Sequence, residues 1–114
     1  MHPYRDTLLT GASLRNGRVY FSASDAAVFE SVRLGDRAGK EPGTAIEIHV
    51  NGETVITDIR QVSGERIGPR MSFAGWFRAV RAQEGATLRL TRLGERRFQL
   101  EYLGRNAGNP GRNP

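Results

Sequence analysis

The sequence predicts a small, mainly β domain with two short helices, arranged as an open barrel. Three observations support this fold class. Residues 45–59 read as a β-hairpin, residues 87–103 read as a second hairpin, and only the short segments 22–30 and 72–82 have helical character. A chain of 114 residues is expected to form one domain. We place this domain at residues 1–104 and expect a flexible tail or linker at 105–114.

The segments before the central hairpin alternate between strands and polar stretches. Residues 7–10 read as a short opening strand, and RVYFS at 18–22 reads as a second strand because it is rich in β-branched and aromatic side chains. The polar stretch 10–18 separates them. After the helix at 22–30, the Gly- and Pro-containing stretch 33–44 is expected to be a solvated loop.

The central hairpin gives the strongest local signal. The Asn-Gly pair at 51–52 favours a two-residue turn. This turn divides the flanking strands into an apolar face, expected to be in the core, and a polar outer face. The apolar face carries Ile46, Ile48, Val50 and Val55, and the outer face carries Glu47, His49, Thr54 and Asp58.

The C-terminal half continues with a helix and the second hairpin. The helix at 72–82 is expected to start at Ser72, and it holds the only tryptophan, Trp76, at helical spacing from other apolar residues. We expect Trp76 to be a buried anchor. The final hairpin is expected to turn at Gly94-Glu95, and its second strand carries Phe98, Leu100 and Tyr102 on one face.

The charge of the chain favours a polyanionic partner. Lys and Arg number 17 against 12 Asp and Glu, and all of the basic residues except Lys40 are arginine. Arginine presents a planar fork that matches phosphate and the guanine edge. An arginine-favouring, GC-rich genome is the other explanation. No apolar run is long enough to span a bilayer, the N-terminus lacks a signal-peptide pattern, and cysteine is absent, so we expect a cytoplasmic protein.

The residues needed for common catalytic sites are scarce. The only histidines are His2 and His49, so no zinc site is expected. The only lysine, Lys40, is not part of a Glu-x-Lys nuclease motif or a complete phosphate loop, and no Gly-x-Ser-x-Gly elbow occurs. We therefore expect a non-catalytic chain without metal or cofactor.

Two polar, basic stretches are longer than simple connections need to be. The stretch 10–18 contains Arg15 and Arg18 and no acidic residue. The stretch 60–77 follows the central hairpin and carries more arginine than acid. Both also offer Ser, Thr, Asn or Gln, the side chains that contact phosphates and read base edges. Two solvated loops on a basic protein are the alternative interpretation.

The order of these segments resembles the DNA-binding pseudobarrel family. That family includes the plant "B-three" domain and the recognition domains of restriction endonucleases such as EcoRII and BfiI. The resemblance lies in LLTGASLRNGRVYFSASDAAVF and in SFAGWFRAVRAQEGATLRL, and it spans roughly residues 7–103. Gly75-Trp76-Phe77 fits the family's helix, whereas Gly85-Ala86 lacks the acidic residue usual in its following turn.

The resemblance implies an open, seven-stranded-type pseudobarrel from which two arms project into the major groove of DNA. The first arm would carry Thr10, Ser13, Arg15, Asn16 and Arg18, and the second Arg60, Gln61, Ser63, Glu65, Arg66 and Arg70.

Roles for these residues follow from side-chain chemistry. Arg15 and Arg66 suit guanine or phosphate, and Asn16 and Gln61 suit adenine. Arg18 and Arg70, near the bases of the arms, suit phosphates. Glu65 has two possible roles, accepting from a cytosine amino group or pairing with a neighbouring arginine.

The sequence therefore predicts sequence-specific recognition of double-stranded DNA. The expected context is the target-recognition domain of a restriction endonuclease, with cleavage on another domain or chain, or a stand-alone DNA-binding protein. The alternatives are a protein–protein interaction module with a basic surface and a small-ligand barrel or cryptic enzyme. Salt separates the first two, because DNA binding weakens log-linearly with salt.

Overall fold

The computed structural model describes residues 2–105, apart from the side chains of residues 25–27. Strands, two α-helices and one 3-10 helix alternate along this part of the chain. In order they are β1 (Tyr4–Leu8), α1 (Gly11–Asn16), β2 (Phe21–Ser22), the 3-10 helix η1 (Ala23–Phe29), β3 (Ile46–Val50), β4 (Glu53–Thr57), β5 (Ile59–Ser63), β6 (Arg66–Pro69), α2 (Ala74–Ala79), β7 (Thr87–Gly94) and β8 (Arg97–Gly104). The mainly β fold with two short α-helices is confirmed, and the predicted tail beyond Arg105 lies outside the described residues.

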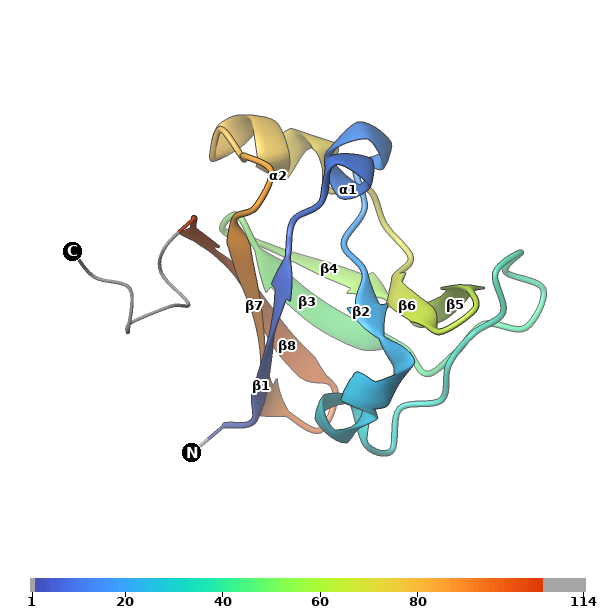
Figure 1. Ribbon diagram of the computed structural model, residues 1–114. Helices are drawn as coiled ribbons and strands as arrows, with labels where there is room; N and C mark the ends of the chain where they lie inside the picture. Colours follow the sequence, from blue (N-terminus) through green and yellow to red (C-terminus); the bar gives the residue numbers. More distant parts are fainter. Residues whose placement is uncertain (1, 106–114) are drawn as a thin grey trace.

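Two open sheets form the fold (Figure 1). One has five strands in the order β1-β7-β8-β3-β4, and the other has three in the order β2-β6-β5. Neighbouring strands are antiparallel except for β3 and β8, which are parallel. Within the described residues no strand ladder joins the two sheets, so the strands do not close into a barrel.

Both predicted hairpins are present. Asn51 and Gly52 have φ values of 55° and 74°, as the expected two-residue turn requires, and Ile48 pairs with Val55. In the second hairpin β7 ends at Gly94 and β8 begins at Arg97, so the turn lies one residue later than predicted. The side-chain faces are as expected from alternation: Ile46, Ile48, Val50, Phe98 and Leu100 are buried, and Tyr102 packs against them.

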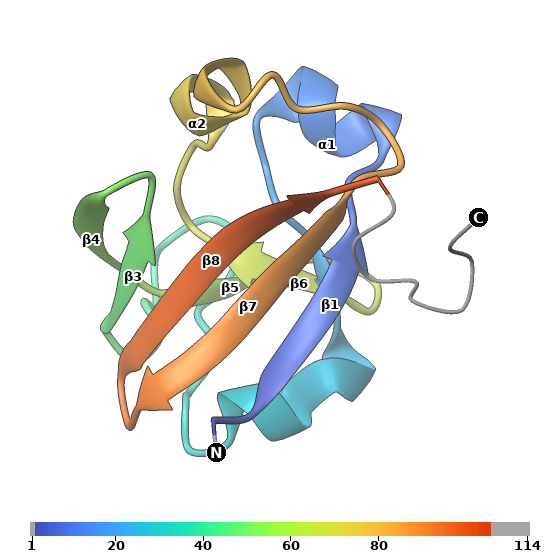
Figure 2. The same cartoon turned by 90° about the vertical axis from the view of Figure 1, so that its left-hand side faces the viewer.

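The core lies between the sheets and is closed at both ends by short helices. Figures 1 and 2 show α1 and α2 together at one end of the molecule and η1 at the other. Phe29 packs between the two sheets, with its ring centroid 5.9 Å from that of Phe21 in β2 and 5.8 Å from that of Phe98 in β8. Trp76 is 7% exposed and lies 5.8 Å from the ring of Phe77. The prediction of a buried Trp76 is confirmed.

The boundaries of several elements differ from the prediction. The opening strand is β1 at Tyr4–Leu8, not 7–10, because it pairs along β7 from Thr91 to Thr87. The predicted helix 22–30 is the 3-10 helix η1. The predicted helix 72–82 is the shorter α2, because Arg81 has a φ of 53° and the chain turns back there. Among the described residues, no helix combines the length and apolar character that a membrane span needs.

Candidate functional site

The first predicted arm is a short helix rather than an extended loop. Thr10 caps α1, because its Oγ1 accepts from the backbone N–H of Ser13 at 3.1 Å. Gly17 ends the helix in the left-handed conformation, with φ of 65°. Ser13 is 2% exposed, so it supports the helix and faces no ligand, whereas Asn16 is exposed at the C-terminal end.

Arg15 is also exposed, but its guanidinium folds back along α1. Its Nη1 lies 3.2 Å from the point where a Cβ on Gly11 would stand, and Oε1 of Glu84 lies 3.1 Å from the same point. The guanidinium of Arg15 therefore lies near the carboxylate of Glu84 at the N-terminal end of α1, whereas Asn16 is at the C-terminal end. Of the two residues, Asn16 is better placed to meet a ligand beyond the end of α1.

We expect Thr10→Ala to lower the free energy of unfolding by about 1 kcal/mol, because the first turn of α1 loses its side-chain cap. Thr10→Ser keeps the accepting oxygen and is the matched control. Urea denaturation of both variants measures the difference. Equal stability of Thr10→Ala and wild type would show that the hydrogen bond to Ser13 does not hold the helix in place.

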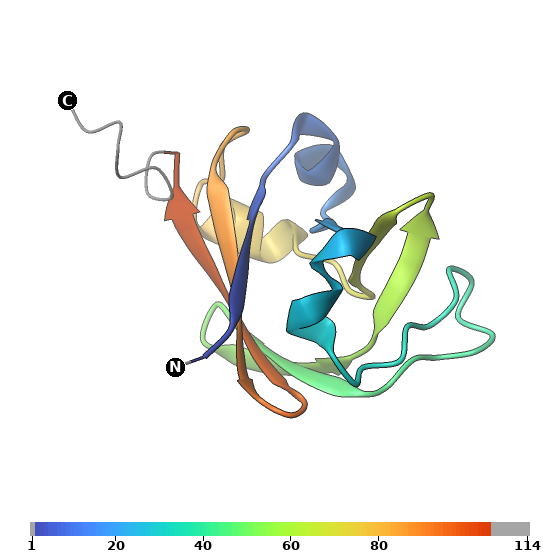
Figure 3. The same cartoon turned by 60° about the horizontal axis from the view of Figure 1, so that its bottom comes forward.

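The second predicted arm is largely a β-hairpin formed by β5 and β6. Its strands pair from Ile59–Pro69 to Ser63–Arg66, with an irregularity between Gln61 and Ser63. The hairpin projects from the body of the molecule in Figure 3. Ser63, Glu65 and Arg66 are exposed at its end, and Nη2 of Arg66 donates to Oγ of Ser63 at 2.8 Å.

The register of the three-stranded sheet gathers cations on its outer face. Arg60 pairs with Gly68, and Arg66 pairs with Ser22, so these four residues face away from buried Ile67. The guanidinium carbon of Arg66 lies 4.9 Å from the ring centroid of Tyr20. We define the arginine face by its members, which are Arg18, Tyr20, Arg60 and Arg66. It extends from the residues that follow α1 to the β5–β6 hairpin.

Arg60 of the arginine face is close enough to Arg18, and to Arg37 and Arg70 beside the face, to be affected by their charges. Burial lowers the pKa of Arg60, and the charges of Arg18, Arg70 and Arg37 lower it further. Arginine nevertheless stays protonated at neutral pH. Arg18 is anchored by donation from Nη1 to the Met71 carbonyl at 2.6 Å. The fold thus holds several positive charges together on one surface.

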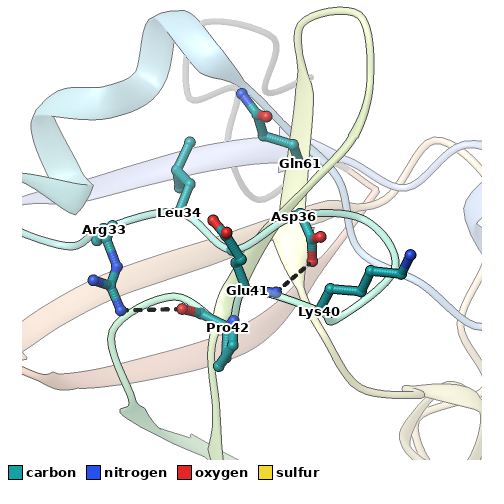
Figure 4. A pocket seen from close by; sticks show the side chains of 8 residues that line it. Arg33, Leu34, Asp36, Lys40, Glu41, Pro42 and Gln61 are labelled. Atoms are coloured by element: carbon teal, nitrogen blue, oxygen red, sulfur yellow. Dashed lines mark hydrogen bonds between the residues drawn. The ribbon is translucent and has the colours of Figure 1, made fainter.

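Two predicted site residues lie away from this face. Gln61 pairs with Ile67, whose side chain is buried, so Gln61 is on the side of β5 opposite Arg60. There it lines an open cavity of about 530 Å³ beside residues 33–42 (Figure 4). Glu65 is exposed at the hairpin turn, and the arginines predicted to pair with it have other partners, Arg66 with Ser63 and Arg70 with Asp58.

Arg70 forms a bidentate ion pair inside the structure. Its Nε donates to Oδ1 of Asp58 at 2.7 Å and its Nη2 to Oδ2 at 3.0 Å. The backbone N–H of Gly43 donates to the same carboxylate at 2.8 Å. Alternation predicted Asp58 on the exposed face, but it is 7% exposed because the chain leaves β4 there and turns its carboxylate toward Arg70. Arg70 supports the structure at a position where the sequence predicted a phosphate contact.

We expect the contribution of Asp58 to stability to disappear in acid. The hydrogen bond from Arg70 and that from Gly43 hold the pKa of Asp58 below 3.8, although burial opposes them. A carboxyl group with a lowered folded-state pKa stabilises the fold above its unfolded pKa and loses that effect as pH falls through the folded value. Denaturation of wild type and Asp58→Asn should therefore differ by a constant amount above about pH 5 and converge below 3.8. A difference that persists unchanged in acid would contradict this.

Other arginines serve the fold as well. Nη1 of Arg92 donates to the Glu30 carbonyl at 2.6 Å and Nη2 to the Glu95 carbonyl at 2.6 Å, which ties the end of η1 to the β7–β8 turn. Arg89 pairs with Asp6 at 2.8 Å across the five-stranded sheet. Arg70, Arg89 and Arg92 therefore have structural partners, whereas Arg66 of the arginine face is exposed.

The comparisons with known proteins add no assignment, since neither the family models nor the curated proteins gave a match. In the part of the chain that the structure describes, no three His, Cys, Asp or Glu side chains gather as a metal-binding group would. The best candidate site is therefore the arginine face, together with α1 and the β5–β6 hairpin. The sequence pointed to three of its arginines and missed Tyr20, whose ring supports Arg66.

Proposed function

We propose that this protein recognises a short sequence of double-stranded DNA, with α1 and the β5–β6 hairpin entering the major groove and the arginine face connecting them. The observation that carries the proposal is the grouping of Arg18, which follows α1, with Arg60 and Arg66 of the β5–β6 hairpin, beside the exposed polar ends of these two elements. Clustered like charges favour a polyanionic ligand, whose phosphates relieve their mutual repulsion. The two open sheets would then be a DNA-binding pseudobarrel.

The side chains divide into readers and phosphate contacts by their position. Asn16 and Arg66 are exposed at the ends of the two projecting elements. We assign them to adenine and guanine edges, the pairings that hydrogen-bond geometry favours. Arg18 follows α1 and is held by the Met71 carbonyl, and we assign its free donors to phosphates.

The biological setting is a further part of the proposal. We propose a target-recognition domain of a restriction endonuclease, with cleavage on another domain or chain, or a stand-alone DNA-binding protein. This part of the proposal rests on the resemblance of the sequence to the pseudobarrel family. The fold alone does not support it, because one fold can serve many functions.

A protein-binding role has less support from the described surface. The large exposed apolar side chains there are Tyr4, Leu8 and Ile56. Tyr4 and Leu8 belong to β1 and Ile56 to β4, at opposite edges of the five-stranded sheet. Single apolar residues scattered in this way are normal on a protein surface and do not form an apolar patch.

Selection from a randomised duplex library tests the proposal, at roughly physiological salt and with nonspecific competitor DNA. We expect one enriched motif, and an affinity for it that falls log-linearly with salt. Salt-sensitive binding without an enriched motif would reduce the function to a basic surface. No binding to any duplex would overturn the proposal and favour the protein-interaction alternative.

A further inference from the structure

The loop 33–44 between η1 and β3 is attached to the three-stranded sheet. Gly35 donates to the Ile59 carbonyl at 2.8 Å and accepts from the N–H of Gln61 at 3.0 Å, so it adds one parallel rung beside β5. A side chain at Gly35 would collide with its surroundings, since a Cβ would lie 2.3 Å from Oδ2 of Asp58. The close fit indicates a fixed position for the base of this loop.

The tip of the loop is closed by its own hydrogen bonds. Oδ1 of Asp36 accepts from the N–H of Gly39 at 2.7 Å and from that of Glu41 at 3.3 Å. The Asp36 N–H donates to the Glu41 carbonyl at 3.0 Å. The carboxylate of Asp36 is thus occupied inside the tip, while Arg37 and Lys40 are exposed. Figure 4 shows Lys40 and Glu41 pointing in different directions.

Arg60 of the arginine face and Arg70 beside it hold this tip from outside. Nη2 of Arg70 donates to the Asp36 carbonyl at 2.7 Å, and its Nη1 donates to the Arg37 carbonyl at 3.2 Å. Nη1 of Arg60 donates to the same Arg37 carbonyl at 3.2 Å. Arg70 is in turn fixed by Asp58. These arginine N–H groups are of the kind that contacts phosphates, but here they donate to backbone carbonyls of the loop.

This arrangement places the loop beside the proposed DNA interface. Figures 1 and 3 show it projecting on the same side of the molecule as the β5–β6 hairpin. The charge of Arg37 also contributes to lowering the pKa of Arg60, so Arg37 lies near the arginine face. Arg37 therefore lies next to the arginine face, and Lys40 and Glu41 line the adjacent cavity with Gln61.

We propose that the loop 33–44 is a third DNA-contacting element, in which Arg37 and Lys40 bind backbone phosphates, with Arg60 and Arg70 as positioning residues that hold the tip in place. The inference rests on the proposed function, because it extends the same interface. It assigns the loop to affinity and not to sequence reading, since a lysine and an arginine on a loop tip beside the groove-entering elements meet the sugar–phosphate backbone.

The test compares Arg37→Gln/Lys40→Gln with Arg96→Gln/Arg97→Gln in duplex binding across a salt series. The control pair is exposed near the β7–β8 turn, and its substitution changes the net charge equally. We expect the loop variant to bind about tenfold more weakly to selected and scrambled duplexes alike, and the log–log salt slope to lose about 0.9 per phosphate contact. The control variant should stay close to wild type.

A double-mutant cycle tests the positioning role of Arg60. If Arg60 acts through the loop, Arg60→Gln weakens binding in the wild-type background and has little further effect in the Arg37→Gln/Lys40→Gln background. Arg60→Lys, which keeps a donor for the Arg37 carbonyl, should restore most of the affinity. Full additivity of the two changes would overturn the positioning role and make Arg60 a direct contact.

The outcomes separate this inference from the function on which it rests. A wild-type protein that binds duplex while the loop variant keeps its affinity and salt slope would overturn the third element alone. A wild-type protein that binds no duplex would overturn both the proposed function and this extension of it.

Discussion

Replacing Asn16 and Arg66 together with alanine is expected to remove most of the preference for the selected sequence, while salt-dependent binding to any duplex remains. The two residues are exposed on separate elements, α1 and the β5–β6 hairpin. A good bidentate base contact supplies about 1–3 kcal/mol of discrimination. Contacts on separate elements add, so the double variant is expected to lose roughly 30-fold to 10⁴-fold in the ratio of specific to nonspecific affinity.

The measurement is the dissociation constant for the selected duplex and for a scrambled one, in each single variant and in the double variant. Arg15→Ala is the matched control. Arg15 is exposed on the same helix as Asn16, but its guanidinium lies toward Gly11 and Glu84. We expect it to change the specificity ratio less than threefold, an amount below about 1 kcal/mol. A double variant that keeps the wild-type ratio would show that these elements do not read bases.

Local sequence signals predicted the parts of the fold that depend on local structure. The Asn51-Gly52 turn fixed the register of the central hairpin, since only a few residue pairs accept two successive positive φ values. Alternation then identified Ile46 and Ile48 as core residues. Helical spacing identified Trp76 in the same way.

Two errors fall on short polar segments, one set by local caps and one by a distant partner. The stretch 10–18 read as a loop because its signals are weak over six residues, yet Thr10 and Gly17 provide the N-cap and C-cap of a helix. The ion pair of Asp58 and Arg70 joins residues twelve positions apart across the start of β5 and the end of β6. Sequence periodicity carries no information about such a pair.

The loop 33–44 escapes prediction for a different reason, because its motifs are incomplete. Ala38 stands where a nuclease motif would place an acidic residue before Lys40, and Glu41 replaces the Ser or Thr of a phosphate loop. The criterion that singles out 60–77, a basic connection longer than its elements need, applies equally to this loop. By that criterion, Arg37 and Lys40 are also candidate DNA-binding residues.

The second large effect concerns stability. We expect Asp58→Ala to lower the free energy of unfolding by about 3 kcal/mol, because it leaves the charge of Arg70 without its partner in a mostly buried site. The side chain of Arg70 is 25% exposed and that of Asp58 is 9% exposed. For a domain of this size the loss corresponds to a fall in Tm of roughly 12–20 °C. Thermal and urea denaturation monitored by Trp76 fluorescence would measure both quantities.

Asp6→Ala is the matched control, since Asp6 binds Arg89 with the same bidentate geometry, at 2.8 and 3.1 Å. Both side chains of that pair are 31% exposed, and Arg89 also lies 4.3 Å from the ring centroid of Tyr4. Water and the ring remain available to Arg89 after the substitution, so we expect a cost of no more than about 1 kcal/mol. Equal losses at Asp6 and Asp58 would mean that burial does not set the strength of these pairs. A larger loss at Asp58, together with faster amide exchange at Gly43 and Gly35, would show that one ion pair both stabilises the domain and fixes the loop that carries Arg37.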